Sequence, residues 1–97
     1  MGWATAYIQK LVAGETVSFR PRGHSMTGKV NDGQLVTVVP LGSPPLVGEV
    51  VLCKVNGAEY LHHVKAVKGA RYLIGNNKGE TNGWTNRVFG RVVKVEP

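Results

Sequence analysis

The apolar residues near the N-terminus recur at helical spacing. They fall at every third or fourth position: Trp3, Ala4, Tyr7, Ile8, Leu11 and Val12. This period is typical of a short amphipathic helix that packs one face against a core. Gly14 follows the pattern directly, and glycine commonly ends helices because it adopts positive φ without strain. We therefore expect a single helix over residues 1–13.

Beyond Gly14 the apolar residues alternate with polar ones or form short β-branched runs, which predicts strands. Gly, Pro, Asn and Asp separate the expected strands, which cover residues 17–19, 35–39, 47–55, 59–67, 71–74 and 88–95. Neither a repeat nor a linker interrupts them. The pattern predicts one domain over residues 1–97, with its β part over residues 15–95. The expected fold is mostly β: a small barrel or sandwich of about five to seven short strands with one N-terminal helix.

The dipeptide Asn56-Gly57 is typical of a two-residue hairpin turn, which fixes the register of the two strands that it joins. Side chains alternate across the second of these strands. One face receives Tyr60, His62, Val64 and Ala66, and the other receives Leu61, His63, Lys65 and Val67. The first face is the less charged of the two, so His62 is the histidine expected to point inward.

The composition is that of a small globular protein. The chain has 97 residues, of which 42% are hydrophobic and 19% charged, and this length fits one domain. Its single cysteine, Cys53, cannot form an internal disulfide, and the first residues lack the pattern of a signal peptide. No apolar run approaches the roughly 20 residues that cross a bilayer. We expect a soluble, cytoplasmic protein without a transmembrane segment.

The net charge of +6, from 12 Lys and Arg against 6 Asp and Glu, would attract nucleic acid or an acidic protein. The positive residues are scattered, with neither a helix-turn-helix pattern nor an aromatic platform, so nucleic-acid binding is not favoured. The three histidines and Cys53 lack the spacing of metal-ligand pairs. No metal or other cofactor is expected.

The segment Arg-Gly-His-Ser-Met-Thr-Gly presents the hydroxyl of Ser25 on a glycine-flanked bend. A serine becomes a nucleophile only when a nearby base takes its proton, and an imidazole suits that role at neutral pH. The chain has three histidines but no recognisable Ser-His-Asp spacing. Local chemistry alone leaves open that Ser25 is an ordinary turn residue.

Five short blocks along the chain form an ordered series that is more specific than any one of them. They are Gly23-His24-Ser25-Met26, Asp32-Gly33-Gln34-Leu35-Val36, Val47-Gly48-Glu49-Val50-Val51, Tyr60-Leu61-His62-His63-Val64 and Phe89-Gly90-Arg91-Val92-Val93. This series resembles the superfamily that unites LexA-type self-cleaving repressors with signal peptidases, and it covers nearly the whole β part. The resemblance implies a serine endopeptidase catalytic domain, without the membrane anchors or the DNA-binding domain found in those relatives.

The resemblance also assigns roles to individual residues. The serine before methionine is the family's nucleophile, which places that role on Ser25, and its own backbone N–H contributes to the oxyanion hole. The histidine-type members have their general base on a strand similar to the one that contains His62. An extended peptide substrate is expected along a strand edge beside the site, with small residues at the cut and with Met26 and Tyr60 as groove candidates.

One expected element is altered. Histidine-type members support the base with an aspartate from a Gly-Asp-Asn-Asn-like segment or from the acidic residues just after it, whereas this chain has Asn76 at the first of these positions. The open candidates for a third member are Asn76, which can orient an imidazole by hydrogen bonding, and Glu80, which can supply a charge.

The alternative function is a catalytically weak or inactive regulatory module on the same fold, binding nucleic acid or an acidic protein through its basic surface. The missing aspartate favours it, and the retention of Ser25 with His62 favours the enzyme. Two further points stay open: a dimer contact through Trp3, and self-processing at Ala13-Gly14, which resembles the bond that LexA-type proteins cut in themselves.

Overall fold

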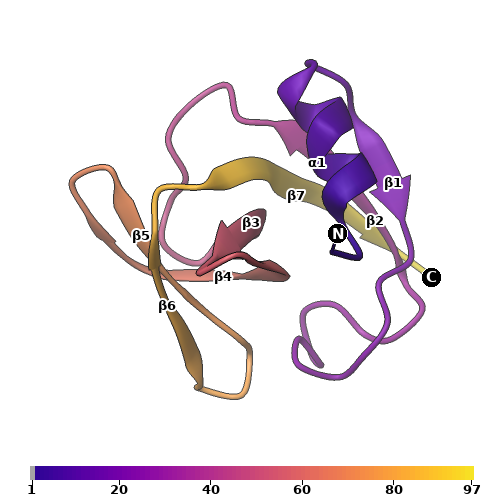
Figure 1. Ribbon diagram of the computed structural model, residues 1–97. Helices are drawn as coiled ribbons and strands as arrows, with labels where there is room; N and C mark the ends of the chain where they lie inside the picture. The colour runs from indigo at the N-terminus through magenta and orange to yellow at the C-terminus, as the bar shows by residue number, and fades with distance from the viewer. Residues whose placement is uncertain (1) are drawn as a thin grey trace.

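Seven antiparallel strands form one open sheet in the computed structural model, which describes residues 2–97 (Figure 1). In chain order the elements are α1 (Thr5–Val12), β1 (Val17–Phe19), β2 (Leu35–Pro40), β3 (Val50–Val55), β4 (Ala58–Lys68), β5 (Arg71–Gly75), β6 (Thr81–Thr85) and β7 (Val88–Glu96). The strand order across the sheet is β1-β2-β7-β3-β4-β5-β6. The mostly β fold with one short N-terminal helix is confirmed. Within residues 2–97, no helix has the length and apolar character needed to span a membrane.

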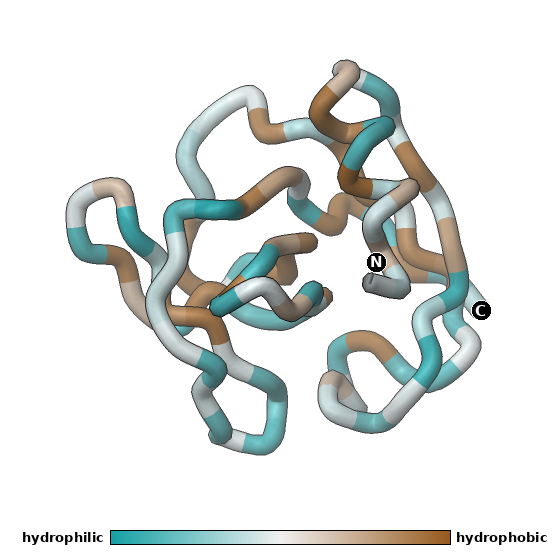
Figure 2. The backbone as a smooth tube through the Cα atoms, viewed as in Figure 1, coloured by the Kyte–Doolittle hydropathy of each residue, from teal (hydrophilic) through white to brown (hydrophobic). Residues whose placement is uncertain are grey.

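The sheet curls so that both faces of its central strands are covered. One core lies beneath α1, where Ile8 and Leu11 pack with residues of β2 and with Leu52 of β3. A second core contains Val51 and Cys53 of the same strand. The apolar run of β3 from Val50 to Cys53 therefore fits a strand buried on both sides. Figure 2 shows apolar positions along α1 and the adjoining strands, whereas the turn between β5 and β6 is hydrophilic.

The helix is shorter than the sequence predicts, because its first turn is set by a distant side chain. Ala4 is the N-cap and supplies no side-chain hydrogen bond. Instead, the buried carboxylate of Glu59 in β4 accepts from the backbone N–H of Ala4 at 2.6 Å and from the hydroxyl of Thr5 at 2.7 Å. At the other end the chain leaves the helix through Gly14, at φ +88°. This is the helix stop expected there.

The predicted strand pattern needs correction at two places, and the predicted hairpin is confirmed. Residues 47–49 form a turn, with Gly48 at φ +94°, so β3 starts at Val50. Strand β6 was not anticipated, because Gly and Asn in Thr-Asn-Gly-Trp-Thr disfavour a strand; pairing with β5 overrides that preference. The Asn56-Gly57 hairpin is confirmed: both residues have positive φ, and Val55 pairs with Ala58.

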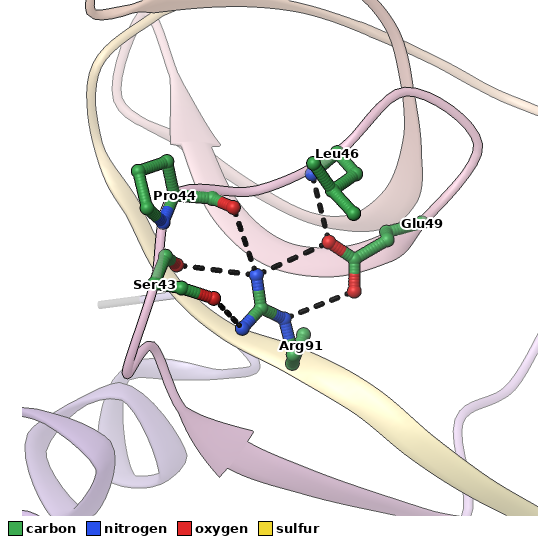
Figure 3. Close-up of polar contacts among 5 residues, drawn as sticks. All are labelled: Ser43, Pro44, Leu46, Glu49 and Arg91. Carbon is green, nitrogen blue, oxygen red and sulfur yellow. Dashed lines mark hydrogen bonds and ion pairs between the residues drawn. The ribbon is translucent and has the colours of Figure 1, made fainter.

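The loop between β2 and β3 is held by Arg91 of β7 (Figure 3). Its guanidinium forms an ion pair with Glu49, with Nε 2.9 Å from Oε2, and donates to the hydroxyl of Ser43 and to the carbonyls of Ser43 and Pro44. The backbone carbonyl of Glu49 in turn accepts from Val64 N–H in β4 at 2.9 Å. One arginine therefore ties this loop to the middle of the sheet.

We predict that Arg91→Ala lowers the free energy of unfolding by about 2 kcal/mol, because several hydrogen bonds to a charged group are lost together. Arg91→Lys should lose at least half as much, since an ammonium cannot form the planar fork. The matched control is Lys94→Ala, which removes the exposed Lys94 partner of Glu96 and should change stability by less than about 0.5 kcal/mol. Urea unfolding measures all three, and equal midpoints for Arg91→Ala and Lys94→Ala would contradict the assignment.

Candidate active site

Ser25 lies on the tightly anchored loop between β1 and β2. The side chains of Met26 and Val30 are buried in the core. Gly23 has φ +114°, and its N–H donates to the carboxylate of Asp32 at 2.7 Å. These contacts hold the loop at both ends while Ser25 itself stays exposed. Its backbone N–H has no hydrogen-bond acceptor within the described chain, residues 2–97.

A second anchor reaches this loop from the turn after β5. Asn77 donates from its backbone N–H to the carbonyl of Ser25 at 2.9 Å and from its side-chain amide to the carbonyl of Thr27 at 2.7 Å. A carbonyl only accepts, so the amide oxygen of Asn77 must face Nε2 of His63, 3.1 Å away. His63 therefore helps to hold the serine loop, and its other ring nitrogen contacts the carbonyl of Gly48.

Ser25 and His62 are in hydrogen-bond contact. The Oγ of Ser25 lies 3.1 Å from Nε2 of His62, and on the other side of the ring Nδ1 lies 2.7 Å from Oδ1 of Asn82. An amide oxygen accepts, so Nδ1 bears the proton and Nε2 is free to accept from the serine hydroxyl. The imidazole has the tautomer and orientation that a general base for Ser25 needs.

Asn82 was missed by the sequence analysis, which proposed Asn76 or Glu80 for this position. Those two bond to each other: the amide of Asn76 donates to the carboxylate of Glu80 at 2.9 Å and closes the turn between β5 and β6. Asn82 lies in β6, and because that strand was not predicted, its residues could not be placed beside β4. The available signal was position, since Asn82 follows directly after the segment in which the family supplies its supporting carboxylate.

Burial alone does not distinguish His62 from His63. His62 and His63 point to opposite faces of β4, yet both are buried, with relative exposures of 8% and 6%. Their partners distinguish them: His62 contacts the hydroxyl of Ser25, whereas His63 contacts Asn77 and Gly48.

Burial sets the ionisation of His62. Desolvation lowers its pKa below the ordinary value of 6.5, and the hydrogen bond with Asn82 opposes this in part. Positive charge at His63 and Lys65 lowers the pKa further. The imidazole is consequently neutral at pH 7, which is the form that accepts a proton.

An open pocket of about 330 Å³ adjoins this pair. Its walls are the loop around Ser25, the first half of β4 and the side chain of Trp3. Both groove candidates, Met26 and Tyr60, line the pocket, and the ring centroids of Tyr60 and His62 are 5.0 Å apart. The pocket leads directly to the serine hydroxyl and has a largely apolar wall.

Cys53 does not compete as a nucleophile. It is fully buried in the second core, and burial raises the pKa of its thiol to about 12. Its reactive thiolate form is therefore negligible at neutral pH.

A family model described as Peptidase S24-like matches residues 4–93, a range that includes Ser25, His62 and Asn82. No curated protein matches the chain.

We predict that an NMR titration of the His62 ring gives a pKa below 6.5, because burial disfavours the cation. Asn82→Asp should raise that pKa, since a carboxylate at Nδ1 stabilises the imidazolium. Thr81→Asp is the matched control: it adds the same charge one residue away at an exposed position and should move the pKa much less. Equal shifts in the two variants would show that Asn82 has no specific contact with the ring.

Proposed function

The chain belongs to the Peptidase S24-like family, and we propose that it is a serine endopeptidase with Ser25 as nucleophile and His62 as general base. The observation that supports this most directly is the 3.1 Å contact between the serine oxygen and Nε2, with Nδ1 held by Asn82. Both contacts match the geometry of acyl transfer.

In the proposed reaction, Ser25 Oγ attacks the scissile carbonyl carbon while His62 Nε2 takes the hydroxyl proton. The backbone N–H of Ser25 donates to the oxyanion that forms on the carbonyl oxygen. His62 then gives its proton to the departing amine, which leaves an ester on Ser25. A water molecule, deprotonated by the same imidazole, attacks this ester and releases the acid product.

Asn82 supports the base but carries no charge. Its amide oxygen accepts from Nδ1–H and so maintains the productive tautomer, yet it stabilises the imidazolium of the transition state less than an aspartate would. We expect slow turnover compared with an aspartate-supported site. The same observation favours the second candidate function, a weakly active or inactive regulatory module on this fold.

We propose that substrates are peptides or proteins that bind in extended form along β4. The strand pairs with β3 along its first half, but pairing with β5 starts only at His63. The first half of β4 therefore has one open edge, which lies along the pocket next to Ser25. An extended peptide can add to such an edge through main-chain hydrogen bonds.

We predict that a fluorophosphonate probe labels the folded protein at Ser25. Ser25→Ala should abolish labelling, and His62→Ala should slow it by about 100-fold or more, the usual contribution of a general base. His24→Ala changes an exposed histidine next to the nucleophile and should label like the wild type, as read by intact mass. Failure of the folded wild-type protein to react would exclude the enzyme and leave the inactive module.

The pH dependence of labelling identifies the base. Neutral His62 is the reactive form, so the rate should rise with pH through a midpoint below 6.5 and stay level up to about pH 8. Rates measured between about pH 4.5 and 9 test this. A rate that is still rising at pH 9 would assign the base to a lysine such as Lys65 instead.

A further inference from the structure

The open edge of β4 is very short. The two-residue turn makes Val55 and Ala58 the closing pair, and hydrogen bonds alternate between the sides of an antiparallel strand. The backbone groups of Glu59 and Leu61 consequently point away from β3, and those of His63 already face Gly75 of β5. Two residues of β4, Glu59 and Leu61, present their N–H and C=O groups to the pocket side.

Trp3 occupies one of these two positions. Its indole N–H donates to the backbone carbonyl of Glu59 at 3.1 Å. That carbonyl therefore already has a donor in the place where a neighbouring strand would supply a backbone N–H. The same indole lines the pocket that contains Ser25 and His62. A strand added to the open edge of β4 would therefore meet the indole when it reached Glu59.

Trp3 is firmly held in this position. The Glu59 side chain, 1% exposed, binds the N–H of Ala4 and the hydroxyl of Thr5, the residues that follow Trp3. Burial of this carboxylate raises its pKa, but these two hydrogen bonds and the charge of Lys54 together hold the pKa below its ordinary value. The indole also packs edge-on against Phe19, with ring centroids 5.8 Å apart.

The distance along the strand sets how much peptide fits. Glu59 and His62 are three positions apart, which is roughly 10 Å at about 3.3 Å per residue. Between the indole of Trp3 and the hydroxyl of Ser25 there is room for about three extended residues.

We propose that Trp3 ends the acyl side of the substrate groove, so that the enzyme recognises about three residues on that side of the scissile bond. The inference rests on the proposed function. The acyl part of the substrate is the segment whose carbonyl forms the ester with Ser25. We assign this part to β4 because it stays bound through the ester intermediate, so its contacts can assist both chemical steps. Past His62 the edge is covered by β5, so the leaving part has no strand edge of β4 to pair with.

The test uses acetylated peptidyl diphenyl phosphonates that end in an alanine analogue and contain one to six residues. The second-order rate of Ser25 modification is followed by intact mass for each length. In the wild type the rate should rise up to three residues and then level off, so the ratio of the five-residue to the three-residue rate is about one. In Trp3→Ala that ratio should be between about three and ten, the effect of one or two additional backbone hydrogen bonds.

Two further variants separate the groove effect from a loss of structure. Trp3→Phe keeps an aromatic ring against Phe19 but frees the carbonyl of Glu59, and its ratio should lie between those of the wild type and Trp3→Ala. Trp84→Ala removes an exposed tryptophan of β6 that lies outside this pocket and should keep the wild-type ratio. Urea unfolding confirms that each variant is folded.

The results distinguish a failure of this inference from a failure of the proposed function. If the rate of Ser25 modification depends on probe length in the same way in the wild type and in both Trp3 variants, the peptidase site stands and the role of Trp3 is wrong. If the one-residue probe and the fluorophosphonate both fail to modify the folded wild type, the proposed function fails and the groove assignment fails with it.

Discussion

The incomplete pairing of β4 is the constraint on which the site depends. The strand is bonded to β3 from its first residue, but β5 covers its other edge only from His63 onward. The uncovered half contains Glu59 and Leu61 and borders the pocket. His62 stands at the boundary between the two halves, where the ring can meet the serine loop on one side and Asn82 of β6 on the other. An edge paired along its full length would leave no place for a substrate strand.

Polar side chains, of which Glu59 and His63 are buried, hold the surrounding elements in place, and each has specific partners. Glu59 anchors the start of α1, His63 and Asn77 anchor the serine loop, and Arg91 anchors the loop that contacts β4. Burying such groups without partners would cost substantial free energy, so each network favours one arrangement of the loops that it joins. The site is thus assembled from loops whose positions are set by hydrogen bonds to the sheet. Preorganisation of this kind is what a general base and its nucleophile require.

The neutral third group changes the electrostatics of the pair. Asn82 orients His62 as an aspartate would, but it leaves burial and the nearby positive charges to dominate the ionisation of the ring. In the proposed reaction the base is therefore available at lower pH than in an aspartate-supported site, and the imidazolium formed during attack is less stabilised. These two effects act in opposite directions on the rate at mildly acidic pH.

Much of the architecture follows from local sequence patterns. The helical spacing around Ile8, the β-branched runs and the Asn56-Gly57 turn are short-range signals, because periodicity and turn geometry depend on neighbouring residues. The motif around Ser25 and the strand that contains His62 also lie within single segments, and for that reason the nucleophile and base could be proposed in advance. These residues were identified without knowing how the segments meet.

Only the tertiary structure decided which residues from different segments are in contact. Asn82 rather than Asn76 or Glu80 contacts His62, because Asn82 lies in β6, which pairs with β5. Likewise, Glu59 binds the start of α1 more than 50 positions earlier in the chain, and Trp3 reaches the same strand. Such contacts depend on the register of the sheet and on burial, and both are set by residues from the whole chain. The sequence by itself was therefore enough to propose Ser25 and His62 as a pair, and only the folded sheet brings Asn82 to His62 and Trp3 to β4.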